Sequence, residues 1–272
     1  MYAIDFEYDG QYLSDYGFII CKFDVASGAN VADAGSKITF NKVSRNNGKT
    51  YSLTSTKYGE CIQCTFDICK NPDLYDYEHR EITNDEHRDL MRWLNRKEFL
   101  KFRVFYDNEN STDVCYYNAS FNISKIKISE KTYGLQLLLE SDKPFGYGEE
   151  RSYSWTFLNE NDTKILNDVS DEIGYIYPDM IITCNSNGDL SIFNESQDCT
   201  MVVKNCSIGE IIYVNGKSQT ISTTYYDHDI CKDFNYDFFK IGNTYKNRIN
   251  KISVSMSCHI VMKYNPIVKD TL

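Results

Sequence analysis

The chain contains no long hydrophobic run and no excess of positive charge, and we expect no secretion leader. No uninterrupted apolar run reaches the roughly 18 residues that a membrane-spanning helix needs, so we expect no membrane partner. Residues 1–7 contain neither the basic region nor the apolar region of a signal peptide. The formal net charge of -10 argues against non-specific binding to nucleic acid or to anionic membranes, because both need concentrated Lys and Arg.

The motifs of common catalytic and cofactor sites are also missing. The sequence contains no G-x-x-x-x-G-K-[ST] phosphate loop, no G-x-G-x-x-G fingerprint and no G-x-S-x-G nucleophile elbow. Carboxylates are plentiful, but no pair stands out in a defined cleft, so a glycoside hydrolase is the weakest of the functional hypotheses. We therefore expect a protein without catalysis, without a cofactor and without a metal site.

Cysteine is abundant, with ten residues, but its spacing does not predict a metal centre. Cys61, Cys64 and Cys69 lie in a run that alternates with period two. In a strand, this spacing places Cys61 and Cys69 on one face and Cys64 on the other, so one ion cannot collect all three. With no secretion signal, we expect reduced thiols in a protein made in a cytoplasm.

The histidines offer no clear catalytic group either. His228 lies between Asp227 and Asp229, which resembles an imidazole oriented by an acid, but no nucleophile signature accompanies it. We interpret this segment as a solvated loop. His259 alternates with apolar residues near the C-terminus and is interpreted as structural.

The residues that are abundant favour β structure. Aromatics make up 14% of the chain, including 22 Tyr and 15 Phe, and such side chains suit a pleated, half-buried surface. Residues 175–264 form a succession of short β-type runs separated by turn residues. Asn187-Gly188 and Asn215-Gly216 each predict a tight hairpin, because both residue types tolerate positive φ. The pattern is typical of a sandwich or jelly roll.

One helix is predicted in the first half. Thr83 and Glu86 have the spacing of a capping box, in which each side chain satisfies a free backbone donor of the other residue. Leu90, Trp93 and Leu94 then recur at the spacing that places them on one helix face. This stripe predicts a helix that packs on a sheet.

A long hairpin and a domain boundary complete the first half. Two β-type arms within residues 37–58 flank a polar tip, which predicts a protruding hairpin. Residues 141–150 contain Pro144 and two glycines and interrupt the strand pattern. We therefore expect two domains, residues 1–145 and residues 146–272.

The order of several segments carries a resemblance to a known family. In chain order these segments are Ile4–Gly10, Leu13–Ile20, Thr65–Asn71, Met91–Phe99, Asp142–Phe145 and the strand pattern of residues 175–264. Together they resemble the distal tail proteins of long-tailed bacteriophages, the siphovirus tail-component family, over essentially the whole chain.

The resemblance implies a mainly β fold and a structural role. The N-terminal domain would be a β-barrel or β-sandwich with one α-helix and a long hairpin, and it would assemble into a hexameric ring. The C-terminal galectin-like β-sandwich would face outward. The ring would join the tail tube protein to the tail-associated lysin or fibre-base protein and to receptor-binding or baseplate proteins, and DNA would only pass through its channel. The protein would be made in the bacterial cytoplasm and reside at the virion tail tip.

Two surface segments are candidate contacts. The hairpin tip is a candidate ring or tube contact, formed by Arg45, Asn46, Asn47, Gly48 and Lys49. The alternative function is a carbohydrate-binding adhesin that recognises host cell-wall sugars. In that case Tyr225 and Tyr226 could stack on a sugar ring, although packing within the sheets is the simpler interpretation of such aromatics.

Overall fold

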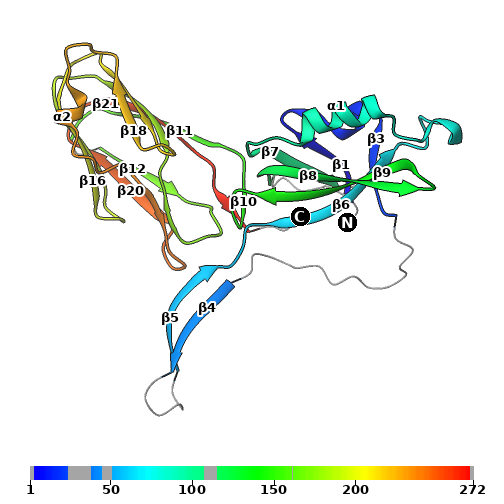
Figure 1. Ribbon diagram of the computed structural model, residues 1–272. Helices are drawn as coiled ribbons and strands as arrows, with labels where there is room; N and C mark the ends of the chain where they lie inside the picture. Colours follow the sequence, from blue (N-terminus) through cyan, green and yellow to red (C-terminus); the bar gives the residue numbers. More distant parts are fainter. Residues whose placement is uncertain (1–2, 24–37, 45–50, 107–114, 161, 270–272) are drawn as a thin grey trace. The chain divides into compact units, whose positions relative to one another are not determined.

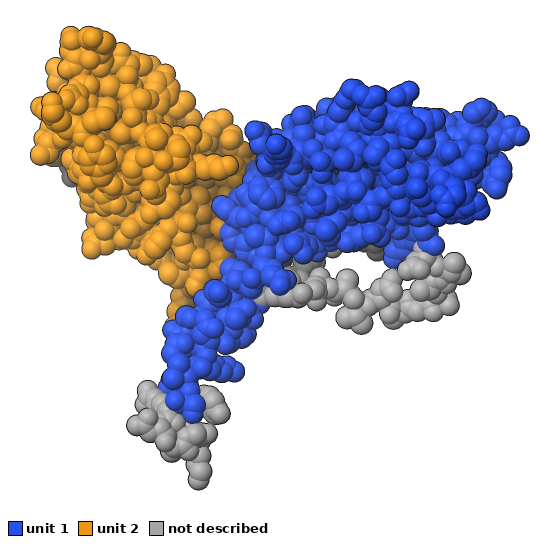
Figure 2. All heavy atoms as spheres, in the orientation of Figure 1, with its two compact units in different colours: residues 1–147, 269–272 blue, residues 148–268 orange. Residues whose placement is uncertain are grey.

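The computed structural model describes residues 3–23, 38–44, 51–106, 115–160 and 162–269. The chain divides into two compact units, residues 1–147 with 269–272 (unit 1) and residues 148–268 (unit 2) (Figure 2). The assignment of a ring-forming role to residues 1–145 and an outward-facing role to residues 146–272 stays a prediction. Among the described residues, no helix is long and apolar enough to cross a membrane.

Unit 1 is built on one antiparallel sheet with the strand order β2-β1-β7-β8-β9-β6-β3 (Figure 1). Its elements are β1 (Ala3–Tyr8), β2 (Gln11–Tyr12), the 3-10 helix η1 (Leu13–Tyr16), β3 (Phe18–Cys21), β4 (Ile38–Ser44), β5 (Tyr51–Tyr58), β6 (Gln63–Lys70), the 3-10 helix η2 (Tyr77–His79), α1 (Asn84–Leu94), β7 (Leu100–Tyr106), β8 (Tyr117–Ile128), β9 (Lys131–Ser141) and β10 (Gly146–Tyr147).

The sheet curls around an aromatic core. Three strands separate β1 from β6 in the sheet order, yet the ring centroids of Phe6 and Phe66 are only 5.6 Å apart. Phe102 and Phe121 extend this cluster with centroids 5.3 Å apart in an edge-to-face arrangement. Such curvature is what allows a single sheet to enclose a core of its own.

Helix α1 forms as its sequence predicts. Thr83 is the N-cap, its hydroxyl accepts a hydrogen bond from the Glu86 backbone N–H at 3.3 Å, and its own N–H donates to Glu86 Oε2 at 2.8 Å. Leu90, Trp93 and Leu94 are the buried residues of the helix. The Trp93 indole stacks on Phe6 and donates its N–H to the Tyr8 carbonyl at 3.0 Å. The capping box and the apolar stripe are therefore both confirmed.

Unit 2 is a β-sandwich. Its elements are β11 (Arg151–Phe157), β12 (Thr163–Asn167), β13 (Gly174–Ile176), β14 (Asp179–Cys184), β15 (Gly188–Asn194), β16 (Cys199–Cys206), β17 (Ile211–Asn215), β18 (Thr220–Thr223), α2 (Ile230–Asp233), β19 (Ile241–Asn243), β20 (Ile249–Val254), β21 (Cys258–Tyr264) and β22 (Ile267–Val268). One sheet has the order β11-β21-β14-β17-β18 and the other β12-β20-β15-β16.

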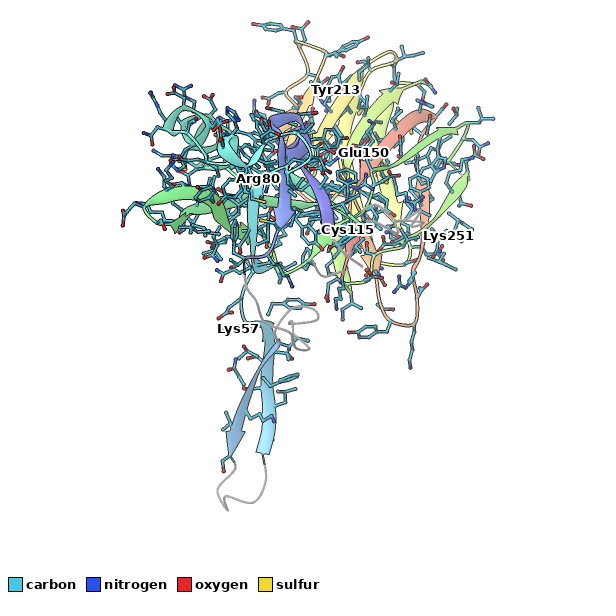
Figure 3. The ribbon with its side chains drawn as sticks, turned by 90° about the vertical axis from the view of Figure 1, so that its right-hand side faces the viewer. Lys57, Arg80, Cys115, Glu150, Tyr213 and Lys251 are labelled. Carbon is cyan, nitrogen blue, oxygen red and sulfur yellow. The ribbon has the colours of Figure 1, made fainter. Side chains whose placement is uncertain are left out.

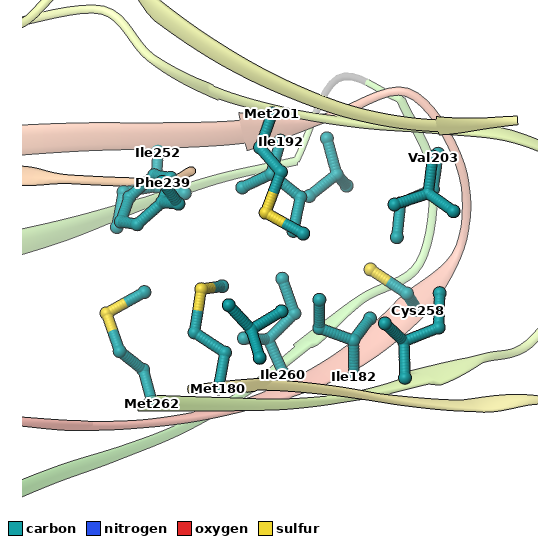
Figure 4. Close-up of a cluster of buried hydrophobic side chains, with 14 of the residues drawn as sticks. Met180, Ile182, Ile192, Met201, Val203, Phe239, Ile252, Cys258, Ile260 and Met262 are labelled. Atoms are coloured by element: carbon teal, nitrogen blue, oxygen red, sulfur yellow. The ribbon is translucent and has the colours of Figure 1, made fainter. Parts of the chain in front are cut away.

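The core of unit 2 forms between these two sheets (Figure 4). Alternate residues of β14 and β21 point inward, among them Met180 and Ile260, and they face Ile192 of β15 and Ile252 of β20. This alternation is the period-two pattern of a sheet with one buried face. The mainly β fold with a C-terminal galectin-like sandwich is confirmed.

One of the two predicted Asn-Gly hairpins is wrong. β14 pairs with β17 and β21, whereas β15 pairs with β16 and β20. The chain therefore crosses from one sheet to the other at Asn187-Gly188. Asn215-Gly216 does begin a hairpin between β17 and β18, but its loop is longer than two residues, because Asn215 pairs with Thr220. The Asn215 side chain accepts from the Ser218 N–H at 2.8 Å and shapes that loop.

Candidate functional site

The hairpin of β4 and β5 is exposed over most of its described residues. The two strands pair with each other, from Ile38 opposite Tyr58 to Ser44 opposite Tyr51, and form a sheet of their own (Figure 1). All residues of β4 are exposed. Lys57 marks β5 in Figure 3. The hairpin predicted for residues 37–58 is therefore present.

Its strands carry apolar side chains that face solvent. Ile38, Phe40, Val43 and Leu53 are each 50–56% exposed. A two-stranded ribbon is marginally stable in water, and exposed strand edges are templates for pairing with another chain. This combination is typical of a surface that is covered in an assembly.

The polar tip of this hairpin, Arg45 to Lys49, lies outside the described residues. Its role as a ring or tube contact stays a prediction. Sequence reasoning stressed the polar tip and missed the apolar arms. Their signal was present in the sequence, because Phe40 and Leu53 stand among Thr, Ser, Asn and Lys in segments that no helix covers.

The two candidate aromatics of unit 2 have different environments. The Tyr225 ring is 39% exposed and its hydroxyl donates to the Ile208 carbonyl at 2.8 Å. Tyr226 is fully exposed. The Tyr225 hydroxyl thus fastens one loop to another, and Tyr226 offers a single free ring. Whether either contacts a sugar stays a prediction.

His228 does not lie in a solvated loop, contrary to the sequence-based interpretation. Its side chain is 6% exposed, and its Nδ1 lies 2.6 Å from Oε1 of the fully buried Glu210. On the other side of the ring, Nε2 lies 3.3 Å from Asp233 Oδ2. Glu210 also accepts from the Ser207 N–H at 2.9 Å and from the Thr223 hydroxyl. The imidazole thus joins the segment before β17 to helix α2.

These contacts shift the pKa of both groups. Burial alone lowers the pKa of His228, but the hydrogen bond and the charge of Glu210 outweigh it and raise the pKa above its usual value. Burial raises the pKa of Glu210, but hydrogen bonds from Thr223, Ser207 and His228 lower it overall. An ion pair results.

The candidate metal ligands of the sequence lie in and beside β6, and His259 contacts a neighbouring strand. Cys61 precedes β6 and is exposed, whereas Cys64 and Cys69 alternate within the strand. In the part of the chain that the structure describes, no three His, Cys, Asp or Glu side chains gather to hold a metal ion. The ring nitrogens of His259 interact with the hydroxyls of Ser154 and Thr156 on neighbouring β11, at 3.2 and 3.0 Å.

Comparisons with known proteins give the family. Residues 1–143 match the family model described as a phage tail protein N-terminal domain, and residues 145–264 match the phage tail C-terminal domain. The chain belongs to this family of phage tail proteins. Searching the curated proteins gave no match.

The fold of this tail protein also matches a solved structure. The crystal structure of the Dit protein (gp 19.1) of phage SPP1 is similar with a TM-score of 0.65 and 14% sequence identity. The match covers 97% of this chain and 99% of that one. The SPP1 protein is described as a paradigm of the hub adsorption apparatus in phages that infect Gram-positive bacteria. The resemblance drawn from the order of sequence segments is thereby confirmed.

Proposed function

We propose that this tail protein is a distal tail protein, the hub of a siphovirus-type tail tip. The observation that carries the proposal is the fold match to the SPP1 hub protein over nearly the full length of both chains. The two family models support it, because they account for both halves of the chain as tail domains. In this role the protein forms a ring, with six copies as the expected number.

In this proposal the two halves have different tasks. Residues 1–145 form the ring between the tail tube protein and the tail-associated lysin or fibre-base protein, and DNA passes through the channel. Residues 146–272 face outward and bind a receptor-binding or baseplate protein. The net charge of -10 suits a channel that must not retain DNA, since phosphates are repelled by an acidic surface. The protein is assembled in the bacterial cytoplasm and ends at the virion tail tip.

The β4–β5 hairpin is the proposed contact between neighbouring subunits. A closed ring requires each subunit to present two different surfaces, one to each neighbour. The exposed apolar side chains of Phe40 and Leu53 supply one such surface. Covering them in the ring would remove the apolar exposure.

The ring itself is tested with the purified full-length chain. We expect light scattering coupled to size-exclusion chromatography to give a mass of six chains, and negative-stain images to show rings with a central hole. A strict monomer at the highest soluble concentration would contradict the proposal.

The hairpin contact is tested separately. Phe40→Ser combined with Leu53→Ser should shift the protein from rings to monomers, because the apolar surface proposed for the neighbour is lost. The matched control combines Leu74→Ser and Leu158→Ser, two side chains that are 66% and 73% exposed outside the hairpin. The control should retain the ring. Rings of unchanged mass from both variants would rule out the hairpin as a subunit contact.

A further inference from the structure

Two cysteines of unit 1 lie side by side on the edge of the seven-stranded sheet. Cys21 is the last residue of β3, the edge strand, and Cys69 belongs to β6, which pairs with it. The antiparallel register places Cys21 opposite Asp67 and Cys69 opposite Ile19. The two cysteines are therefore diagonal neighbours whose side chains share one face of the sheet.

The two thiols are free, half-buried and in mutual contact. Contact with Cys21 lowers the pKa of the Cys69 thiol, and the positive charge of Arg80 lowers it further, against the effect of burial. The same contact raises the pKa of Cys21. Cys69 is thus the thiol that ionises first, and thiolates are the reactive form of cysteine.

A small molecule can reach Cys69. The residue lines an open cavity of about 470 Å³, together with Phe23, Tyr133 and Arg80, which is labelled in Figure 3. Cavities of roughly 300–1,000 Å³ accommodate small ligands. The positive charge of Arg80 near the thiol also suits an acidic peptide such as glutathione.

A second pair of neighbouring thiols lacks this access. Cys184 and Cys206 also contact each other, but their side chains are only 1% and 2% exposed in the core of unit 2. An oxidant cannot reach them without opening the sandwich. They provide an internal comparison, a second pair of contacting thiols that differs from the first in its exposure.

We propose that Cys21 and Cys69 form a disulfide once the tail protein leaves the reducing cytoplasm. The bridge would close the segment between the two residues, which carries the entire β4–β5 hairpin. It would also fasten β3, which pairs with the sheet through β6. The inference does not depend on the proposed ring function, because the disulfide can be mapped on the purified chain whether or not that chain forms rings.

The oxidant is a small disulfide of the glutathione type. The Cys69 thiolate attacks one sulfur of oxidised glutathione, the S–S bond of that molecule breaks, and one glutathione thiolate leaves. Cys21 then loses its proton to water and attacks Cys69 Sγ, which releases the second glutathione. Two protein thiols are oxidised and one glutathione disulfide is reduced to two thiols, so the electrons balance.

The geometry requires the backbone at the end of β3 to move. Diagonal neighbours in a sheet have Cα atoms about 7–8 Å apart, beyond the range of about 4.4–6.8 Å that disulfides span. β3 has four residues and lies at the sheet edge, and Cys21 is its final residue. Because β3 pairs with β6 on one side only in the sheet order, its end can shift without breaking hydrogen bonds to a second strand.

The test exposes the purified full-length chain to oxidised glutathione at neutral pH, then blocks free thiols and maps peptides by mass spectrometry without reduction. We expect one internal bridge between Cys21 and Cys69, with Cys184 and Cys206 still free. Closing a loop of this length should raise the melting temperature of unit 1 by about 5 °C or more, and a reductant should reverse the rise.

Single substitutions separate the role of Cys69, which attacks the oxidant, from the role of Cys21, which closes the bridge. Cys21→Ser should stop at a stable glutathione adduct on Cys69, whereas Cys69→Ser should form no internal bridge at Cys21. The control Cys61→Ser removes an exposed thiol outside the pair and should still form the bridge. No bridge in the natural chain, adducts on both Cys21 and Cys69, or preferential bridging of Cys184 and Cys206 would each overturn the proposal.

Discussion

Replacing Trp93 with alanine should destabilise unit 1 by about 3–5 kcal/mol, the usual cost of removing a large aromatic from a core. The indole is 4% exposed and lies between the rings of Phe6 and Tyr16, with centroids 5.7 and 4.5 Å away in stacked orientations. Its N–H also satisfies the Tyr8 carbonyl at 3.0 Å. Truncation would therefore leave a cavity and remove a buried hydrogen bond.

The measurement is native-state hydrogen exchange, which reports the opening free energy of unit 1 separately from that of unit 2. The matched variant Trp93→Phe retains an aromatic ring and loses the indole donor. We expect it to cost about 0.5–1.5 kcal/mol, the net contribution of one hydrogen bond. Equal losses for both variants would mean that packing of the indole contributes little. A cost below about 1 kcal/mol for alanine would show that Trp93 does not anchor helix α1.

Replacing His228 with alanine should destabilise unit 2 by about 3–5 kcal/mol near pH 6, because the variant leaves the carboxylate of Glu210 buried without its cationic partner. Glu210 is fully buried, and its hydrogen bonds from Ser207 and Thr223 do not neutralise its charge. The control is His259→Ala, whose ring nitrogens interact with the hydroxyls of the exposed residues Ser154 and Thr156. That control should cost less than about 1.5 kcal/mol, the range of an ordinary hydrogen bond.

The contribution of the His228–Glu210 ion pair to the stability of unit 2 should fall both at high pH and at low pH. The pKa of His228 is raised in the folded protein, so its stabilising effect is complete below the ordinary value of 6.5 and is lost as pH rises through the folded pKa. The pKa of Glu210 is lowered, so its effect is complete above the ordinary value of 4.5 and is lost as pH falls through the folded pKa.

The stability difference between the natural chain and His228→Ala should therefore be largest between pH 4.5 and 6.5. It should shrink toward pH 9 and toward pH 3. Chemical denaturation followed by hydrogen exchange in unit 2 would measure it at each pH. A difference that does not change with pH would mean that the ring acts through packing alone.

Features that depend on neighbouring residues in the chain were predictable from the sequence. Helix α1 follows from Thr83, Glu86 and the stripe at Leu90, Trp93 and Leu94, because capping and helical spacing act over only a few residues. The arms of the β4–β5 hairpin and most strands of unit 2 follow from period-two alternation for the same reason. The order of such segments was also sufficient to indicate the tail-protein family, which the family models match over both halves.

Features that depend on which strands meet were decided by the tertiary structure. Asn187-Gly188 has the local chemistry of a hairpin, but β14 and β15 pair with other strands, so burial of their apolar faces in opposite sheets prevails over turn propensity. His228 is buried because Glu210, 18 positions earlier, approaches it. Cys21 and Cys69 become neighbours only through the register of β3 and β6. The sequence by itself determined the elements and the family. The long-range contacts arise only when the elements pack, because local propensity does not specify partners that are distant in the chain.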